Sequence, residues 1–399
     1  MAKRLFAVGI GTVTSPHLFE ARTRLATRKP APSSAKTRVK APARRRAAAP
    51  PAAAAPTPKR QVTMADVAAH VGVSKMTVSR ALNRSGSSER ITSEALRQRI
   101  LLACADMGYV LDQTARTFSS KRSGFIAAVI PSLNNSNFSE TAHGITAAVE
   151  GSGLQLLLGY SDYRVENEER LVAAMLMRRP EGVILTGGSH SAGTHAMLAS
   201  AGIPVVETWD LPAHPIEHTV GFSNAQATAA MVHQLHANGY RHIAFIGGTS
   251  NRDTRGADRR RGYTEAIKAL GLPAGRVISF GEPPISMEQG AEAIVQLVHQ
   301  WPDVDAVVCV SDLSAFGALM ECQRRGWAVP KRIAIAGFGD FEVARSCHPT
   351  ITTVAIDSTG IGRAAGELLM RAIDEARTGA RLPAETVLIP FRIMARGST

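Results

Sequence analysis

The feature that most restricts the fold of this chain is an alternation of short apolar runs with amphipathic segments of helical length. Seven apolar runs suit strands buried on both faces of a parallel sheet: 125–130, 154–159, 182–186, 204–207, 242–247, 306–310 and 333–338. The segments between them predict helices over 166–178, 225–238, 258–270, 287–299 and 314–325. Gly239, Gly271 and Gly326 follow three of these segments, where helices commonly end. The pattern predicts an α/β fold with doubly wound parallel sheets.

The alternating region is longer than one sheet usually organises, so we expect two similar lobes. No glycine group forms a GxGxxG fingerprint or a GxxxxGK[ST] phosphate loop, which disfavours chemistry on nucleotides. The four cysteines, Cys104, Cys309, Cys322 and Cys347, are scattered and form no Cys-x-x-Cys pair. His233 and His236 have no third ligand nearby. We therefore expect no metal, no cofactor and no catalytic residues.

Charge divides the chain into two parts. Residues 1–61 hold fourteen basic residues and one acidic residue, which accounts for the whole net charge of +13. Within this part, residues 41–58 contain nine Ala and five Pro, a composition that prevents a stable helix. We expect a disordered basic extension over residues 1–61. It either attracts phosphates without sequence specificity or is an incidental extension from a mis-called start codon.

A helix-turn-helix is predicted at residues 62–85. Thr63 with Asp66 three residues later marks a helix start, Gly72 permits a tight turn, and Ser74 is a second N-cap. The second helix would turn Val78 and Leu82 inward, and its exposed, largely polar and basic side would present Lys75, Met76, Thr77, Ser79, Arg80 and Asn83. A third helix over 93–107 would close the small core. The alternative is an ordinary helical hairpin with a solvated face.

These residues carry a resemblance to a known family. VTMADVAAHVGVSKMTVSRALN and ITSEALRQRILLACADMGYV resemble the LacI/GalR family of bacterial repressors, as do VGFSN, GYRHIAFIG, RRRGY, VSDLSAFGAL and VPKRIAIAGFGD further along. Within the family, SKMTVSR and ECQRRG look most similar to gluconate-operon repressors. The resemblance covers 62–399 and implies a DNA-binding domain (62–108), a hinge (109–123) and a two-lobed, periplasmic-binding-protein-like effector and dimerisation domain (124–399).

The resemblance also implies how the head would contact DNA. Lys75, Met76 and Arg80 would read base edges in the major groove, and Arg80 suits a bidentate contact with guanine. Five polar residues would hold phosphates: Thr63, Ser74, Thr77, Ser79 and Asn83. In the hinge, Phe118 stands where relatives insert a leucine into the minor groove, and Leu111 replaces a common proline. Either Phe118 wedges between base steps or it packs against the lobe.

For the effector module, the resemblance implies a small ligand between the lobes. Arg259 matches the arginine that grips the effector and suits a sugar-acid carboxylate; the alternative is a surface cation in the run 259–261. Asp312 follows a strand and can accept from sugar hydroxyls. Ser132 and Asn134 follow the first strand, and Trp209 with Asp210 follows the fourth.

The function we expect is a cytoplasmic, homodimeric transcription repressor that binds double-stranded operator DNA and answers to a sugar or sugar acid. The C-terminal region contains no leucine heptad repeat, so we do not expect a tetramer. No apolar run approaches the roughly 18 residues that span a bilayer, so we expect no membrane partner. One alternative is a sugar- or phosphosugar-modifying enzyme with an appended helical head. Another is an exported sugar-binding protein.

Overall fold

The computed structural model of this chain describes residues 62–82, 93–109, 123–248 and 252–399. The predicted extension over 1–61, Asn83 and Phe118 lie outside the described residues. A small head comprises α1 (Met64–Val71), α2 (Lys75–Leu82) and α3 (Glu94–Met107). Val67, Val78 and Ile100, one from each helix, are fully buried and form its core. The three predicted helices of the head are thus present.

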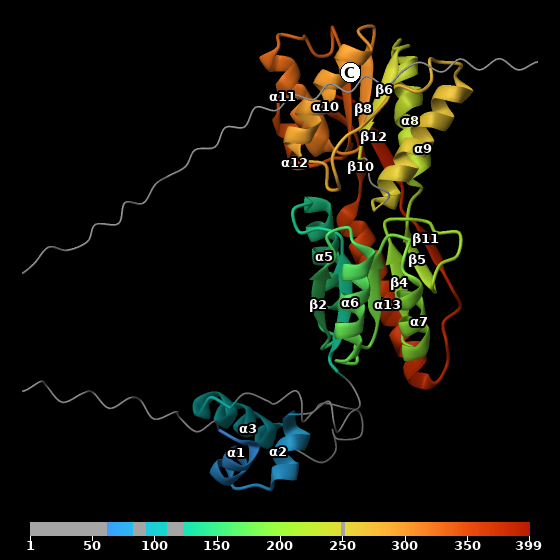
Figure 1. The fold of residues 1–399 in the computed structure, drawn as a ribbon. Coiled ribbons are helices and arrows are strands. Elements are labelled where there is room, and N and C mark those ends of the chain that lie inside the picture. The colour runs from blue at the N-terminus through green and yellow to red at the C-terminus, as the bar shows by residue number, and fades with distance from the viewer. Residues whose placement is uncertain (1–61, 83–92, 110–122, 249–251) are drawn as a thin grey trace, which may run out of the picture. The chain divides into compact units, whose positions relative to one another are not determined.

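The rest of the described chain forms two lobes, an N-lobe and a C-lobe, each built around a six-stranded sheet (Figure 1). The N-lobe sheet has the order β11-β5-β4-β3-β1-β2, and the C-lobe sheet has the order β12-β10-β9-β8-β6-β7. The N-lobe strands are β1 (Phe125–Ile130), β2 (Gln155–Tyr160), β3 (Val183–Thr186), β4 (Val205–Thr208), β5 (His218–Gly221) and β11 (Thr386–Leu388). The C-lobe strands are β6 (Ile243–Gly247), β7 (Val277–Ser279), β8 (Ala306–Cys309), β9 (Ala334–Gly339), β10 (Thr352–Ile356) and β12 (Phe391–Met394).

All strand pairs are parallel except β12 with β10, which is antiparallel. The seven predicted strands correspond to β1, β2, β3, β4, β6, β8 and β9, which confirms the doubly wound α/β fold. The purely parallel expectation is corrected at β12, and five strands were not foreseen: β5, β7, β10, β11 and β12. These are short or contain buried polar residues, so they lack the continuous apolar run that marks the others.

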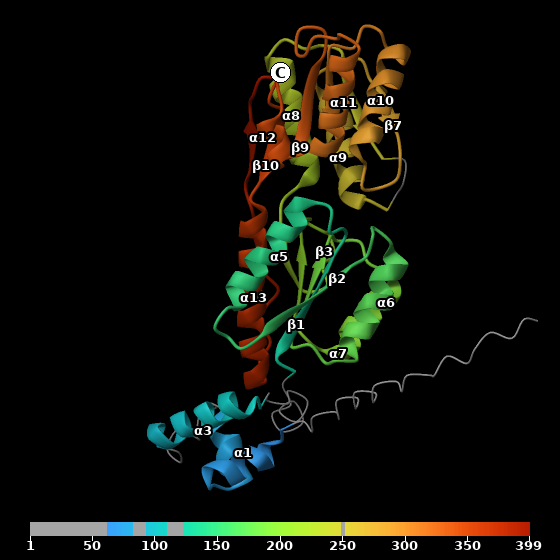
Figure 2. The same cartoon turned by 90° about the vertical axis from the view of Figure 1, so that its left-hand side faces the viewer.

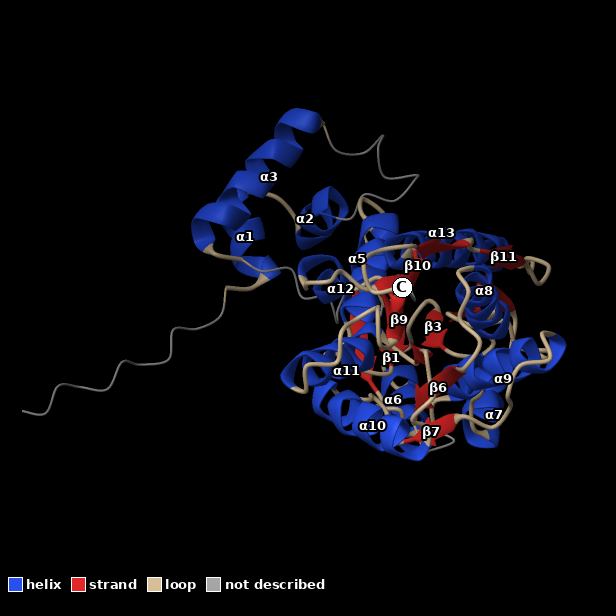
Figure 3. Ribbon diagram, turned by 90° about the horizontal axis from the view of Figure 1, so that it is seen from above, coloured by secondary structure: helices blue, strands red, loops and turns tan. Residues whose placement is uncertain are grey.

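Helices cover both faces of each sheet, as Figures 2 and 3 show. In the N-lobe, α5 (Ser136–Val149) and α13 (Ser358–Thr378) pack on one face, and α6 (Val165–Leu176) and α7 (Ala192–Ala201) on the other. In the C-lobe, α8 (Asn224–Ala237) and α9 (Thr254–Ala269) oppose α10 (Met287–Gln300) and α11 (Asp312–Arg324). A short helix, α12 (Glu342–Ser346), follows β9.

The chain crosses between the lobes three times: between β5 and α8, between β10 and α13, and between β11 and β12. Both β5 and β10 therefore end at the boundary between the lobes. In parallel sheets the carboxyl ends of all strands lie at one edge, so both sheets present their carboxyl edges to this boundary. Loops that follow the strands, where α/β proteins bind ligands, consequently meet there.

Helices α5 and α13 approach each other closely. A Cβ at Gly362 of α13 would lie 2.0 Å from the Thr141 carbonyl oxygen of α5, and one at Gly144 would lie 2.2 Å from the Thr359 carbonyl oxygen. Only glycine permits this separation. Among the helices of the described ranges, none combines the length and the apolar character needed to cross a membrane.

Candidate functional site

Two side-chain caps shape the helix-turn-helix. The Asp66 carboxylate accepts from the Thr63 backbone N–H at 2.8 Å and from the Thr63 hydroxyl at 2.7 Å. Ser74 Oγ accepts from the Thr77 N–H at 3.1 Å at the start of α2. Between the helices, Gly72 adopts a φ of 75°, a left-handed conformation that suits glycine. Both predicted helix starts and the predicted turn are therefore formed.

Helix α2 has one buried face and one open face. Val78 and Ala81 are buried, and Arg97 of α3 donates from Nε to the Ala81 carbonyl oxygen at 3.3 Å, which anchors the end of α2. The open face presents Ser74, Lys75, Met76 and Arg80 as exposed residues, with Thr77 and Ser79 half-buried and Thr63 exposed at the start of α1. Met76 is 61% exposed, so its apolar side chain is available for contact with a partner. This face can insert into a groove without disturbing the core.

A cavity lies between the carboxyl edges of the two sheets. From the N-lobe it is lined by Asn135, Asn137, Phe138, Tyr163 and Trp209, and from the C-lobe by Asp253, Arg255, Arg259, Ser311, Phe338 and Phe341. Its free volume is about 30 Å³, room for one or two water molecules. A sugar-sized ligand therefore requires the lobes or these side chains to move apart.

Arg259 lies in this cavity wall, where two of its three guanidinium nitrogens donate hydrogen bonds to neighbouring residues. Its Nε donates to Asn224 Oδ1 at 2.9 Å, and its Nη1 donates to the Val310 carbonyl oxygen at 2.8 Å. The guanidinium stacks 3.7 Å from the centre of the Phe338 ring. Burial lowers the pKa of Arg259 to about 10, so the side chain remains charged near neutral pH. It is not the surface cation of the alternative interpretation.

Arg255, one turn earlier on α9, is buried in a different manner. It is only 6% exposed, yet its Nη1 has no hydrogen-bond partner among the described residues. The guanidinium lies 5.3 Å from the centre of the Phe138 ring and 5.7 Å from that of Tyr163. Asp253 Oδ1 is 3.7 Å from Arg255 Nε, too far for a hydrogen bond, and also lacks a hydrogen-bond partner.

Trp209 lines the cavity, whereas Asp210 lies beside it. Trp209 is 2% exposed and has a φ of 70°, and its indole Nε1 donates to Thr141 Oγ1 at 3.0 Å. Its ring packs edge-on against Phe138 and Phe222. Asp210 accepts from the Leu211 N–H, and burial raises the pKa of its carboxyl group. The structure thus places Trp209 at the cavity and leaves Asp210 outside its lining.

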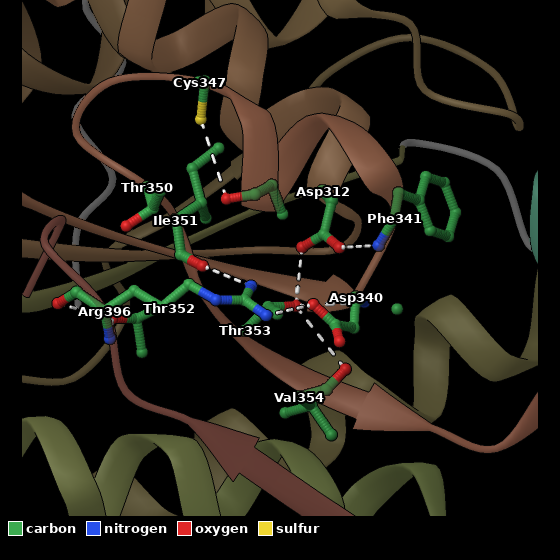
Figure 4. A network of polar contacts seen from close by, with 12 residues as sticks. Asp312, Asp340, Phe341, Cys347, Thr350, Ile351, Thr352, Thr353, Val354 and Arg396 are labelled. Atoms are coloured by element: carbon green, nitrogen blue, oxygen red, sulfur yellow. Dashed lines mark hydrogen bonds and ion pairs between the residues drawn. The ribbon is translucent and has the colours of Figure 1, made fainter.

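Asp312 lies behind the cavity wall in a polar network (Figure 4). Its carboxylate accepts from the Phe341 N–H at 2.7 Å and from the Thr353 hydroxyl at 2.6 Å. Burial raises the pKa of Asp312 to about 6. In the same network Arg396 donates to Asp340 Oδ1 at 2.6 Å and to the Ile351 carbonyl oxygen at 2.9 Å. Asp312 therefore holds the loop that carries Phe341 and does not itself line the cavity.

The two residues predicted after the first strand also lie outside the cavity lining. Ser132 is buried, and its hydroxyl accepts from the Asn134 N–H at 3.1 Å, while Asn134 itself is exposed. The nearby Asn135 and Asn137 take their place in the lining. Asn137 Nδ2 also donates across to the Gly339 carbonyl oxygen of the C-lobe at 3.2 Å.

Several residues of the cavity lining were not predicted from the sequence, above all Arg255, Tyr163 and Phe138. Two features of the sequence could have identified Tyr163 and Arg255. Tyr163 follows β2 as Asn135 follows β1, so both stand after the carboxyl end of a strand. Arg255 lies one helical turn before Arg259, on the same face of α9. Among the described residues there is no group of three or more His, Cys, Asp or Glu side chains that could hold a metal ion.

Comparisons with known proteins agree with this architecture. Residues 63–112 match the family model of bacterial regulatory proteins, lacI family, and residues 232–399 match a periplasmic binding protein-like domain. The HTH-type transcriptional regulator GntR of Escherichia coli K12 is 35% identical over 315 residues, which cover 79% of this chain and 93% of that protein. GntR of Pseudomonas aeruginosa is 34% identical over 337 residues, covering 84% and 95%.

Solved structures extend the comparison. A LacI family transcriptional regulator from Silicibacter pomeroyi is 43% identical with a TM-score of 0.65, covering 69% of this chain and 98% of that one. The regulator GntR from Chromobacterium violaceum is 37% identical with a TM-score of 0.62, with coverage of 69% and 98%. The lac repressor dimer bound to operator and an anti-inducer is 21% identical with a TM-score of 0.73, covering 85% and 99%, and shows the shared fold.

Proposed function

This chain belongs to the lacI family of bacterial regulatory proteins and is a DNA-binding transcriptional regulator. From this premise we propose that it is a homodimer that binds one class of operator sequence and represses transcription there. Two heads would bind the half-sites of a near-palindromic operator, because the symmetry of a dimer is mirrored in its DNA. We place its action in the cytoplasm, where such DNA is accessible. We also propose the domain division 62–108, 109–123 and 124–399.

The observation that carries the DNA-binding proposal is the open face of α2. Lys75, Met76 and Arg80 stand exposed on one helix whose opposite side is buried. Arg80 offers a guanidinium for the two acceptors of guanine in the major groove, and Lys75 offers a single charged donor. Five further residues would hold phosphates, namely Thr63, Ser74, Thr77, Ser79 and Asn83, and Phe118 would wedge in the minor groove.

For the effector we propose a sugar or sugar acid, of which gluconate is the representative. The cavity between the lobes combines aromatic rings with amide, hydroxyl and guanidinium groups, a composition typical of sugar sites. Of the residues expected at this site, we propose that Arg259 and Trp209 line it and that Ser132, Asn134, Asp210 and Asp312 support its loops. Effector binding would favour a lobe arrangement with lower operator affinity, through a differential affinity for the two states.

DNA binding can be tested by selecting operator fragments from a pool of random duplexes and measuring fluorescence anisotropy. We expect Arg80→Ala to weaken binding to the selected operator by about 1–3 kcal/mol and to relax specificity at one base pair of each half-site. The matched control is Arg99→Ala, an equally charged and exposed residue on α3. Equal losses in both variants would contradict base reading by α2.

Effector action can be tested in the same assay with added gluconate. We expect the ligand to raise the dissociation constant for the selected operator and to leave binding to random DNA nearly unchanged. Unaltered operator affinity with gluconate and with other sugars and sugar acids would contradict regulation by this class of effector. Measurable turnover of any of these ligands would instead favour the enzyme alternative.

A further inference from the structure

We propose that Arg178 and Arg179, which follow α6, form a second DNA-binding surface on the N-lobe and bind backbone phosphates beside the centre of the operator. The partner is the DNA that the head is proposed to bind, so this inference rests on the proposed function. It adds a contact made by the lobe to those of the head and the hinge. The contact carries no base specificity, because phosphates are the same at every base pair.

The two arginines lie at the edge of the N-lobe where the hinge joins it. The loop 177–182 connects the end of α6 to the start of β3, so it lies at the amino edge of the sheet. Within this loop, Glu181 Oε1 accepts from the Gly124 N–H at 3.2 Å. Arg179 is two residues before Glu181, which limits the distance between their Cα atoms to about 7 Å. The loop is therefore close to Ser123, at which the proposed hinge ends.

Neither arginine is neutralised within the described part of the chain. Both side chains are exposed, and neither forms an ion pair or a side-chain hydrogen bond with another described residue. Other arginines at this edge do have carboxylate partners. Arg377 of α13 pairs with Glu181 at 2.6 Å, and Arg381 pairs at 2.8 Å with Glu217, which precedes β5. The two arginines of the loop consequently remain available to an anionic partner.

Arg179 occupies a position at which glycine would be more favourable. It follows the end of α6 with a φ of 54°, and its N–H donates to the Leu176 carbonyl oxygen at 2.9 Å. Helices α1, α3, α7 and α13 are each followed by a glycine in the same left-handed conformation. A Cβ is crowded by the backbone in this conformation, a cost that glycine avoids. The charged side chain is present although it does not favour the fold, which indicates a role in binding.

The length of the hinge brings DNA to this edge of the lobe. Phe118, which would wedge in the minor groove under the proposed function, precedes Ser123 by five residues. Five residues span at most about 18 Å when fully extended, and the minor groove is only about 6 Å wide. Since the lobe itself excludes DNA from its volume, the duplex has to pass beside the surface at which Ser123 lies. The long side chains of Arg178 and Arg179 can reach phosphates there.

The test measures binding of the full chain to the selected operator by fluorescence anisotropy over a range of salt concentrations. Each phosphate contact contributes about 0.9 to the slope of log K against log salt, and a dimer makes each contact twice. We therefore expect Arg178→Gln and Arg179→Gly each to reduce the magnitude of the slope by about 1.8 and to raise the dissociation constant about 3- to 30-fold. The selected base sequence should stay the same.

Three measurements separate phosphate binding from a structural role. Arg179→Gly should unfold at a temperature no lower than the wild type while it binds the operator more weakly, because glycine suits the left-handed conformation. Arg179→Lys keeps the charge and should keep the salt slope. The matched control is Arg170→Gln, which removes the same charge from an exposed position on α6. It lies about two helical turns from the loop, beyond the screening length of about 8 Å, and should leave the slope unchanged.

An unchanged salt slope in both Arg178→Gln and Arg179→Gly would overturn the proposal. A loss of affinity at an unchanged slope would overturn it too, since it would assign the loop to a contact with protein. A loss that accompanies a lower unfolding temperature in both variants would indicate a structural role instead. In these cases the proposed function stands if Arg80→Ala weakens operator binding more than Arg99→Ala, because that comparison does not involve the lobe. A wild type that selects no operator would overturn both.

Discussion

The N-lobe and the C-lobe share one strand order but differ in the direction of their last strand. Strand β11 runs parallel to β5, whereas β12 runs antiparallel to β10. Only Ile389 and Pro390 separate β11 from β12, so the chain passes almost straight from one sheet into the other. Because both sheets point their carboxyl ends at the boundary, a straight chain leaves one sheet parallel and enters the other antiparallel. The difference follows from the connection and needs no special residues.

The interiors of the two lobes differ in how they hold charge. In the N-lobe, His190 Nδ1 lies 2.7 Å from Glu168 Oε1, and its Nε2 lies 3.2 Å from the Gly187 carbonyl oxygen and 3.4 Å from Glu207 Oε1. The partners are carboxylate and carbonyl oxygens, which favour the protonated, cationic imidazole with a hydrogen on each ring nitrogen. In the C-lobe, Asp312 is buried and binds neutral donors, a backbone N–H and a hydroxyl.

Two sheets with the same strand order can therefore bury ionisable side chains of opposite charge with different kinds of partner. The N-lobe pairs a buried cation with carboxylates. In the C-lobe, the buried carboxylate of Asp312 accepts hydrogen bonds from a backbone N–H and a hydroxyl and has no arginine, lysine or histidine in direct contact among the described residues. Both arrangements lower stability as the pH rises, but in separate ranges of pH, which makes the comparison testable.

The largest effect is expected for His190→Gln in the N-lobe. Removing the cation leaves Glu168 and Glu207 buried without a positive partner, and we expect the free energy of unfolding to fall by about 3–5 kcal/mol at pH 7. Urea denaturation checks this loss. His195→Gln, an exposed neighbour whose ring centre lies 6.1 Å away, is the matched control and should change stability by less than about 0.5 kcal/mol.

The same variant should alter the pH dependence. Burial acts to lower the pKa of His190, but its hydrogen bonds to the Glu168 and Glu207 carboxylates and their negative charges prevail and raise the pKa from 6.5 to about 9. Because the histidine pKa is raised on folding, its protonation stabilises the fold by about 3 kcal/mol. This stabilisation is fully present below pH 6.5 and is lost as the pH rises through 9. Wild-type stability should decline over this range, and the decline should vanish in His190→Gln. An equal decline in the variant would assign it to other groups.

A smaller effect, in a lower pH range, is expected for Asp312→Asn in the C-lobe. Burial raises the pKa of Asp312 from 3.8 to about 6, so the folded state binds a proton that the unfolded state releases. The wild type should therefore lose up to about 3 kcal/mol as the pH rises from 3.8 to 6, and Asp312→Asn should not. Asp258→Asn, on the surface of α9, is the control. Parallel pH profiles for wild type and Asp312→Asn would refute the contrast between the lobes.

The smallest effect is expected for Asn137→Ala, which removes a contact between the lobes. Asn137 Nδ2 donates to the Gly339 carbonyl oxygen at 3.2 Å, and its loss should cost about 1 kcal/mol of unfolding free energy. The freed lobes should also separate more easily, which small-angle scattering would detect as a larger radius of gyration. Ser139→Ala, on the exposed side of α5, should change neither quantity.

Much of the fold could be predicted because most of its central strands are continuous apolar runs that can be recognised in the sequence. Runs such as 125–130 and 333–338 are apolar on both faces, and this pattern is local. Strand β5 was missed because His218 and Thr219 are polar yet buried, their burial supplied by β11 from far along the chain. Helix α13 was missed because its glycines weaken the helical signal, and they are explained only by its close approach to α5.

The sequence by itself determined the head and the family. The caps at Thr63 and Ser74, the turn at Gly72 and the open face of α2 depend on residues within a few positions of one another, so local spacing suffices to predict them. It also identified Arg259 as a residue of the effector module. The features of the head rest on short-range geometry, which the order of residues specifies directly, whereas Arg259 was identified through the resemblance to the family.

Only the tertiary structure decided how the cavity is built. Arg255 lies among Phe138, Tyr163 and Gly187, residues 68 or more positions away, and its unpaired donor is a consequence of what those neighbours lack. Likewise, Asp312 is turned away from the cavity by Phe341 and Thr353. Whether a polar atom is satisfied depends on every group packed around it, and that set forms only when distant segments meet.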